Sequence, residues 1–153
     1  MKKIPLSNSD KFVLVDDDKF DYLNQWRWQL VRGYAKRCRK LPKKKYTTIT
    51  LSREVVSARP GQKVIYRDSD TLNCTKDNLI IGTQRNVTQH SRGKKNNRTK
   101  IKGVRKAGKK FSATIKINGK SNYIGTFETK EAAALAYDQR SIKEFGVFAK
   151  TNN

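Results

Sequence analysis

One hairpin constrains the fold of this chain more than any other feature of its sequence. The dipeptide Asn118-Gly119 is the strongest short signal for a two-residue hairpin turn. Residues 111–117 before it alternate between apolar and polar, as a half-buried strand does. The turn sets the register of the two strands, with the pairs Ile117–Lys120, Lys116–Ser121, Ile115–Asn122, Thr114–Tyr123 and Ala113–Ile124. The polar face of the hairpin then presents Thr114, Lys116, Ser121 and Tyr123.

A third strand and a helix complete the fold that we expect for residues 101–153. A short strand over residues 101–106 would pair with residues 111–117 through a turn at 107–109. Thr129 can cap a helix, and Gly146 can end it. Apolar residues at helical spacing would face the sheet: Ala132, Leu135, Ala136, Ile142 and Phe145. We therefore predict three antiparallel strands packed on one helix.

The first half of the chain has a less regular pattern. It favours strands at 12–15, 47–51 and 62–66, a strand pair at 26–37 bent at Gly33, a short helix or turn at 16–25 and a helix start at Thr75. Trp26 and Trp28 are expected to pack inside this part. Residues 91–100 hold five basic residues, a glycine and no large apolar side chain, which is the composition of a linker. The predicted organisation is a module over 1–90, a basic linker over 91–100 and a domain over 101–153, in the α+β class.

Positive charge narrows the range of functions. The chain carries 35 Lys and Arg against 13 Asp and Glu, a net charge of +22. No acidic residue occurs between Asp77 and Glu128, or between Tyr22 and Arg53. Such a field favours a polyanionic partner, because neutralising phosphates releases their condensed counterions. A basic amphipathic helix with a bulky apolar face, which would favour a membrane surface, is not evident. Nucleic acid is the partner that this charge indicates.

Several other classes of protein are not expected. The sequence has no apolar run of the length that spans a bilayer, and polar residues from Ser7 onward interrupt a secretory signal. Cys38 and Cys74 are therefore read as free thiols. With His90 as the single histidine, a four-ligand structural zinc site would need carboxylate help. We expect no metal, no cofactor, no membrane partner and a cytoplasmic location.

The last third of the chain resembles the DNA-binding domain of plant ethylene-response factors, the APETALA type. The matching segments are residues 101–105, 108–116, 124–129, 131–138 and 145–146, with the closing Asn152. In that family the three-stranded sheet lies in the major groove. The resemblance places these residues on the DNA side: Lys102, Gly103, Arg105, Thr114, Lys116, Ser121 and Tyr123. Further basic residues beside the strands and in the linker are expected to add phosphate contacts: Lys106, Lys109, Lys110, Arg92, Lys94, Lys95 and Arg98. The strands carry fewer arginines than the plant pattern and no tryptophan, so Arg105 is the main candidate for a bidentate guanine contact.

In HNH homing endonucleases of phages and mobile elements, the same DNA-binding domain also occurs after the HNH module. The first half of this chain is similar to these proteins. The similarity lies in residues 21–28 and 33–35 and in the frame Leu51, Arg53, Pro60-Gly61, Val64, Asp70, Leu72, Asn78-Leu79 and Thr83. It implies a ββα-metal module. In the family this module needs a histidine base and a metal held by Asp, His or Asn.

The positions that would carry nuclease chemistry are changed in this chain. Ile65 stands where the acidic metal ligand belongs, Tyr66 where the base belongs and Cys74 where the orienting asparagine belongs. Ser52 replaces the histidine of the upstream His-Arg pair, and Asn78 alone is retained. Isoleucine cannot bind a metal, and a tyrosine with an ordinary pKa near 10 is a poor base at neutral pH. The module is therefore interpreted as a degenerate, catalytically dead HNH-like domain.

The combined expectation is a sequence-specific double-stranded DNA-binding protein derived from an HNH homing endonuclease. Occupancy without cleavage favours transcription regulation, as a repressor of phage or mobile-element origin in the cytoplasm of a bacterial host, associated with the nucleoid. Two alternatives stay open: an active HNH endonuclease with an unusual centre, and an accessory protein that protects a target site. A homodimer on DNA also stays open.

Overall fold

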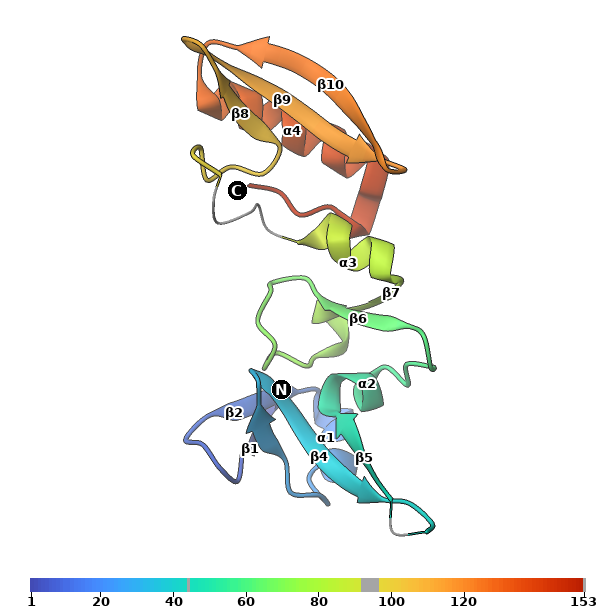
Figure 1. Cartoon of the computed structure of the whole chain (residues 1–153). Helices are drawn as coiled ribbons and strands as arrows, with labels where there is room; N and C mark the ends of the chain where they lie inside the picture. The colour runs from blue at the N-terminus through green and yellow to red at the C-terminus, as the bar shows by residue number, and fades with distance from the viewer. Residues whose placement is uncertain (44, 92–96, 153) are drawn as a thin grey trace. The chain divides into compact units, whose positions relative to one another are not determined.

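The computed structural model describes residues 1–43, 45–91 and 97–152. The chain is α+β, with several small antiparallel sheets and four α-helices in this described part. It divides into two compact units, Met1–Gln84 and Arg85–Asn153. No helix of the described residues is long and apolar enough to cross a membrane. Figure 1 labels most of the helices and strands of both units.

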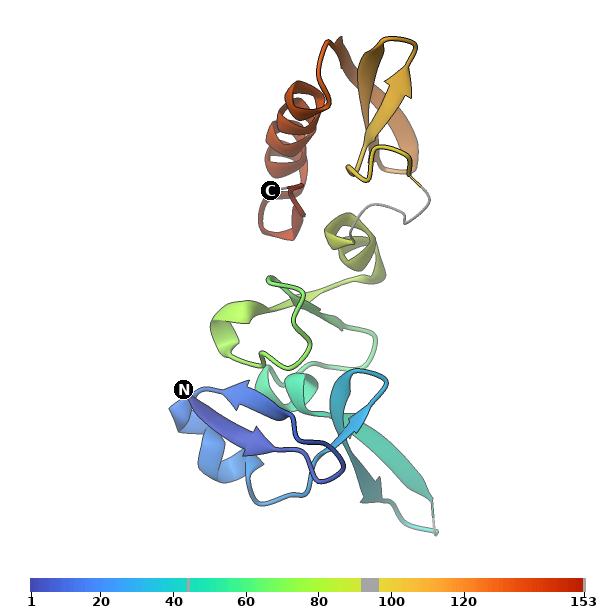
Figure 2. The same ribbon diagram turned by 90° about the vertical axis from the view of Figure 1, so that its left-hand side faces the viewer.

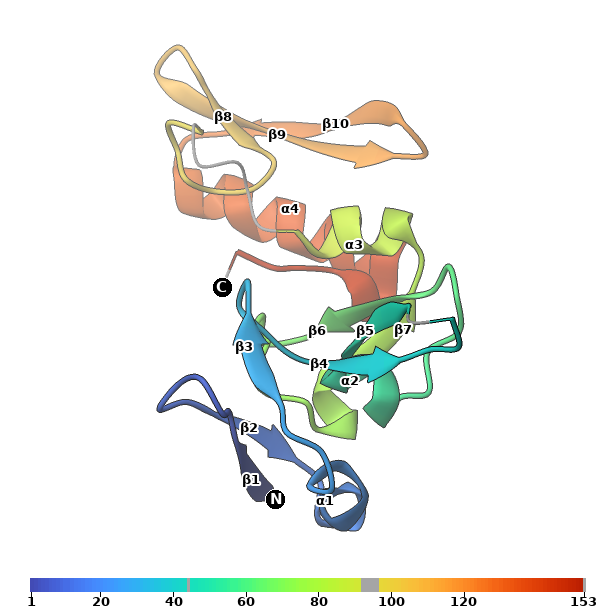
Figure 3. The ribbon, with the colours of Figure 1, turned by 60° about the horizontal axis from the view of Figure 1, so that its bottom comes forward.

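The first unit begins with a two-stranded sheet of β1 (Lys2–Pro5) and β2 (Phe12–Val15), followed by helix α1 (Asp17–Leu23). A three-stranded sheet of β3 (Gln29–Val31), β4 (Tyr34–Lys40) and β5 (Tyr46–Thr50) has the order β3-β4-β5 and leads into helix α2 (Leu51–Val55). Figure 3 shows these three strands together. The predicted strand at 12–15, the short helix or turn at 16–25 and the bend at Gly33 are confirmed. The strand predicted at 47–51 is present but runs from Tyr46 to Thr50, because Leu51 begins α2.

A second hairpin closes the first unit. Strand β6 (Lys63–Tyr66) pairs with β7 (Leu79–Gly82), and a 3-10 turn, η1 (Lys76–Asn78), lies between them. Helix α3 (Gln84–His90) follows β7 after a single intervening residue, and from Arg85 onward it belongs to the second unit. The helix start predicted at Thr75 is this short 3-10 turn. Trp28 is fully buried and its Nε1 donates to the Leu23 carbonyl at 2.8 Å, so its predicted role in packing is confirmed.

The second unit contains the predicted sheet. Strands β8 (Val104–Ala107), β9 (Lys110–Ile117) and β10 (Lys120–Phe127) have the order β10-β9-β8. Helix α4 (Lys130–Phe145) packs on all three strands, and a 3-10 turn, η2 (Gly146–Phe148), follows it. Figure 2 shows α4 along one side of this sheet. The Thr129 hydroxyl accepts from the Ala132 amide at 3.2 Å, as expected of a helix cap.

The face of α4 that covers the sheet differs from the predicted one, although Phe145 packs against the core as predicted. Leu135 and Ile142 are each 54% exposed, and Ala132 is also exposed. The buried residues are Ala133, Ala134, Tyr137, Asp138 and Ser141. The large ring of Tyr137 and the hydrogen-bonded carboxylate of Asp138 take the inner face, and Ala133 allows a close approach of helix and sheet. Apolar spacing alone did not identify this face, because two of its residues are polar.

The boundary of the second unit lies earlier in the chain than the predicted domain boundary at 101. Asn97 donates from Nδ2 to the Val104 carbonyl at 3.2 Å, and Thr99 donates from Oγ1 to the same carbonyl at 2.8 Å. Residues 97–100, which we assigned to a linker, are therefore bonded to the start of the sheet. The linker residues 92–96, with Arg92, Lys94 and Lys95, lie outside the described residues.

Candidate nucleic-acid interface

The face of the sheet opposite α4 carries the predicted hairpin residues. Direct partners across antiparallel strands share a face, and the structure pairs Lys116 with Ser121 and Thr114 with Tyr123, as predicted. The inward face is occupied by the buried residues Val104, Ala113 and Ile115. Arg105 pairs with Ser112 and therefore lies on the outward face. The outward face thus presents Arg105, Ser112, Thr114, Lys116, Ser121, Tyr123 and Thr126.

A β-bulge in β10 changes the register after Tyr123. Ala113 pairs with Gly125, and not with Ile124 as predicted. The extra residue allows Ile124 and Phe127 to pack against the core, while Tyr123 and Thr126 both face solvent, with 2.6 Å between their hydroxyl oxygens. A bulge is a local device for redirecting side chains. The predicted register missed the bulge because it assumed a regular strand, in which Ile124 and Phe127 would point to opposite faces.

Lys102 is partly buried, whereas Arg105 on the outward face is exposed. Its ammonium donates to the Gln89 carbonyl of α3, and its backbone is bound on both sides by the amide of Asn152, at 2.7 and 3.3 Å. Burial lowers the pKa of Lys102 to about 8. The structure therefore gives Lys102 a packing role that the resemblance did not suggest.

Gly103 also has a packing role. Its φ is +76°, and a Cβ built there would lie 2.1 Å from the Tyr137 ring and 2.9 Å from the Thr114 carbonyl oxygen. The Thr114 amide donates to the Gly103 carbonyl at 2.8 Å. Close contact between this turn and α4 therefore requires glycine. This requirement accounts for Gly103 without a DNA contact.

A groove of about 870 Å³ in the second unit is lined by residues from both faces of the sheet. Residues of α3, of the segment 97–106 and of β9 line it, with Tyr137 and Phe145 among its apolar residues. Its cationic residues are Arg85, Arg98, Lys102, Arg105, Lys106 and Lys116, and no Asp or Glu is among the lining residues. Positive charge concentrated in a groove focuses the electrostatic potential that attracts phosphate groups.

The remaining predicted contacts lie around the β8–β9 turn. Lys106 and Lys109 are exposed, and Lys106 pairs with Phe111, which places it on the α4 side of the sheet at its edge. Lys110 forms an ion pair with Glu128 at 2.6 Å, so part of its charge is compensated. Arg105 and Lys116, which no ion pair of the described residues involves, are the better placed cations for a phosphate or base contact.

The four positions that the sequence comparison assigned to a degenerate nuclease centre meet in the first unit as a buried cluster. Ile65, Tyr66, Cys74 and Asn78 are all at most 8% exposed. The Tyr66 hydroxyl donates to Ser52 Oγ at 2.7 Å, so the two residues that we expected at the base position and at the upstream histidine position are in direct contact. Burial raises the pKa of Tyr66 well above its usual value and that of the Cys74 thiol to about 12. Both groups are held neutral, and neither can act as a base at neutral pH.

Asn78 has a structural role in the same cluster. Its Oδ1 accepts from the Asp68 amide at 3.0 Å, and its Nδ2 donates to the Asn73 carbonyl at 2.8 Å. These bonds hold the loop between β6 and β7 together. Within the described residues, no group of three or more His, Cys, Asp or Glu side chains is close enough to hold a metal ion.

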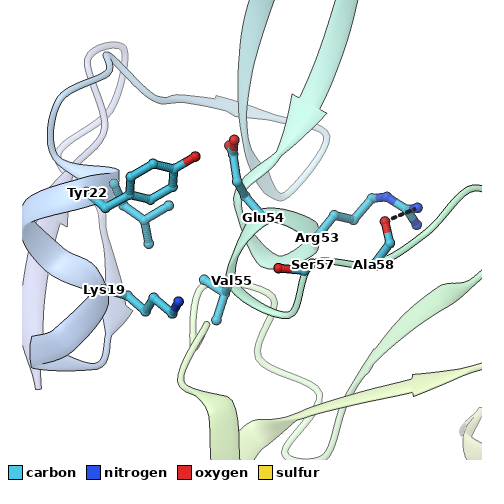
Figure 4. A pocket seen from close by; sticks show the side chains of 8 residues that line it. Lys19, Tyr22, Arg53, Glu54, Val55, Ser57 and Ala58 are labelled. Atoms are coloured by element: carbon cyan, nitrogen blue, oxygen red, sulfur yellow. Dashed lines mark hydrogen bonds between the residues drawn. The ribbon is translucent and has the colours of Figure 1, made fainter.

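A second hollow in the first unit lies between α1 and α2 and measures about 500 Å³. Figure 4 shows Lys19 and Tyr22 from α1 on one side and Glu54, Val55 and Ser57 on the other. Arg53 at its rim donates to the carbonyls of Gln62 at 2.7 Å, Ala58 at 3.2 Å and Arg59 at 2.8 Å. Its guanidinium is therefore used to fix the loop after α2.

Sequence reasoning missed one cationic residue of the groove, Arg85, and one residue of the outward face, Thr126. Arg85 belongs to α3, which was not predicted, and Thr126 reaches the outward face only through the bulge. Residues 84–90 lack an apolar stripe, so the only available signal was their position after a strand.

A scan against models of known protein families finds no match for this chain.

Proposed function

We propose that this chain is a sequence-specific double-stranded DNA-binding protein that derives from HNH homing endonucleases and no longer cleaves DNA. The observation that carries the proposal is the groove with six cationic and no acidic lining residues, beside the sheet face with Arg105, Lys116 and Tyr123. A duplex supplies both phosphates for the lysines and base edges for Arg105. The neutral, buried state of Tyr66 and Cys74 supports the absence of nuclease chemistry.

The sheet face is the base-reading surface in this proposal. Arg105→Ala should cost about 1–3 kcal/mol on the selected site and flatten the preference for it over random duplex. Arg140→Ala is the matched control, because Arg140 is an exposed arginine of the same unit whose guanidinium is paired with Glu144 at 2.9 Å. Fluorescence anisotropy on both duplexes measures the two effects. Equal losses on selected and random duplex for Arg105→Ala would contradict base reading by this residue.

The biological output that we propose is repression by occupancy, in a phage or a related mobile element. A protein that binds a promoter and leaves it intact excludes polymerase from the same DNA. A promoter reporter should therefore be repressed by the wild type and released by the combined variant Arg105→Ala, Lys116→Ala and Tyr123→Ala. Repression that persists in this variant, or a best site inside a coding region with no effect on transcription, would favour site protection instead.

A further inference from the structure

Strands β4 and β5 extend beyond the sheet of the first unit as a two-stranded ribbon. Strand β3 pairs with β4 only from Tyr34 to Lys36. Past that point β4 pairs with β5 alone, down to the pair Lys40–Tyr46. The Leu41 amide donates to the Lys45 carbonyl at 2.7 Å, which continues the ribbon into its turn. Figure 1 shows the two arrows running side by side to this turn.

The ribbon carries a high density of positive charge. Residues 34–50 contain no Asp or Glu, and their basic residues are Lys36, Arg37, Arg39, Lys40, Lys43, Lys44 and Lys45. Among the described ones, only Arg37 takes part in an ion pair, with Glu54 at 2.9 Å. Arg39, Lys40, Lys43 and Lys45 are exposed. These cations repel one another, so the fold gains nothing from their proximity.

Arg37 is a cation of this ribbon whose contacts within the first unit give it a structural role. Its side chain is 10% exposed, its guanidinium lies 4.0 Å from the centre of the Trp26 ring, and Glu54 holds it from α2. It anchors the base of the ribbon to the core. The exposed cations Arg39, Lys40, Lys43 and Lys45 have no comparable ion pair among the described residues. We therefore attribute their arrangement to a partner outside the chain.

The acidic residues of the first unit are concentrated elsewhere. Four of them belong to the segment that begins α1: Asp16, Asp17, Asp18 and Asp21. Two of these have cationic partners in the same unit, Asp17 with the N-terminal amine at 2.8 Å and Asp18 with Lys76 at 2.5 Å. The unit is therefore polarised, with acidic groups at α1 and a cationic ribbon at β4–β5.

We propose that the β4–β5 ribbon is a second DNA-binding element of this chain, which lies in a groove of the duplex and contacts its phosphates. The proposal rests on double-stranded DNA being the partner but uses a surface separate from the sheet of the second unit. The major groove of B-DNA admits a two-stranded ribbon. The solvent face offers Cys38 and Lys40 on β4 and Tyr46 and Thr48 on β5, with Tyr46 67% exposed.

Cys38 is a native probe at the centre of this surface. It is exposed, whereas Cys74, the other cysteine of the chain, is 1% exposed and burial raises its pKa to about 12. Alkylation by iodoacetamide therefore modifies Cys38 in the folded protein. Saturating mixed-sequence duplex should slow this reaction at least about tenfold, because the bound duplex shields the thiol from the reagent. The full-length double variant Cys38→Ser, Asp21→Cys carries the thiol on α1 and should show no slowing.

The salt dependence of binding gives a second readout. The triple variant Arg39→Gln, Lys40→Gln, Lys45→Gln should lower the slope of log affinity against log salt by about 2.7, at about 0.9 for each lost phosphate contact. The control variant Lys2→Gln, Lys11→Gln, Lys63→Gln removes the same charge from exposed positions of the same unit and should change the slope much less.

The outcomes separate the two proposals. If the wild type binds no duplex at all, the proposed function fails. If duplex binds but Cys38 reacts at its free rate and the two triple variants have equal slopes, the ribbon proposal alone is overturned. Protection of Cys38 by polyglutamate and not by duplex would likewise overturn it in favour of an acidic protein partner.

Discussion

The substitution Gly103→Ala should destabilise the second unit far more than its small size suggests. The residue has a φ of +76°, which costs a residue with a Cβ about 1–2 kcal/mol. The new methyl would also lie 2.1 Å from the Tyr137 ring, and Tyr137 is 3% exposed, so the ring has little room to move. Overpacking of this kind costs about 1–3 kcal/mol. We therefore expect a total loss of about 2–5 kcal/mol.

Gly108→Ala is the matched control for this substitution. Gly108 has a φ of +62°, but nothing lies within 4 Å of a Cβ built there, so only the backbone cost of about 1–2 kcal/mol applies. Both tryptophans of the chain, Trp26 and Trp28, belong to the first unit. In urea unfolding, Gly103→Ala should therefore shift part of the far-UV circular dichroism transition and leave the tryptophan fluorescence transition in place. Equal losses in the two glycine variants would refute the contact with Tyr137 as the cause.

Three further outcomes are expected. Asn152→Ala removes a donor to the buried Asp138 carboxylate at 2.8 Å and both hydrogen bonds to the Lys102 backbone. In the same assay it should lower the free energy of unfolding of the second unit by about 2–4 kcal/mol, whereas the exposed control Asn122→Ala should change it little. Burial lowers the pKa of Lys102 from 10.5 to about 8. Between these two pH values the unfolded chain binds more protons than the folded one, so the stability of the second unit should rise from pH 8 to pH 10. The substitution Lys102→Met should weaken this rise, whereas the control Lys106→Met should not. With Mg²⁺ or Mn²⁺ the protein should leave its bound DNA intact, and Tyr66→His should restore no cleavage because Ile65 still offers no metal ligand; nicking that disappears in Asn78→Ala would contradict this reading.

Much of the second unit could be predicted from local patterns. The turn at Asn118-Gly119, the register from Ile117 to Thr114 and the cap at Thr129 all match the structure, because each depends on residues close together in the chain. The predicted register fails only after Tyr123, where the bulge begins. A bulge depends on which side chains the core accepts, and a strand pattern does not contain that information.

The candidate site was predicted in part. Arg105, Thr114, Lys116, Ser121 and Tyr123 share the outward face as expected. Lys102 and Gly103 were placed on the DNA side from the resemblance, but the structure shows that Asn152, Gln89 and Tyr137 surround them. These partners lie up to fifty residues away, which is beyond the reach of any local pattern.

The sequence by itself determined the composition of this protein's surface and the local elements of its second unit. Net charge, the hairpin turn and the helix cap are properties of single residues or of near neighbours. Tertiary structure alone decided which face of α4 is buried. Tyr137 packs against the Gly103 turn and Asp138 accepts a hydrogen bond from Asn152, and these contacts place both residues on the inner face. It also decided that α3 lines the cationic groove and that the basic residues of β4 and β5 stand together on a ribbon. Contacts between distant segments cost loop entropy that only the packed core repays, so they become defined when the whole unit folds.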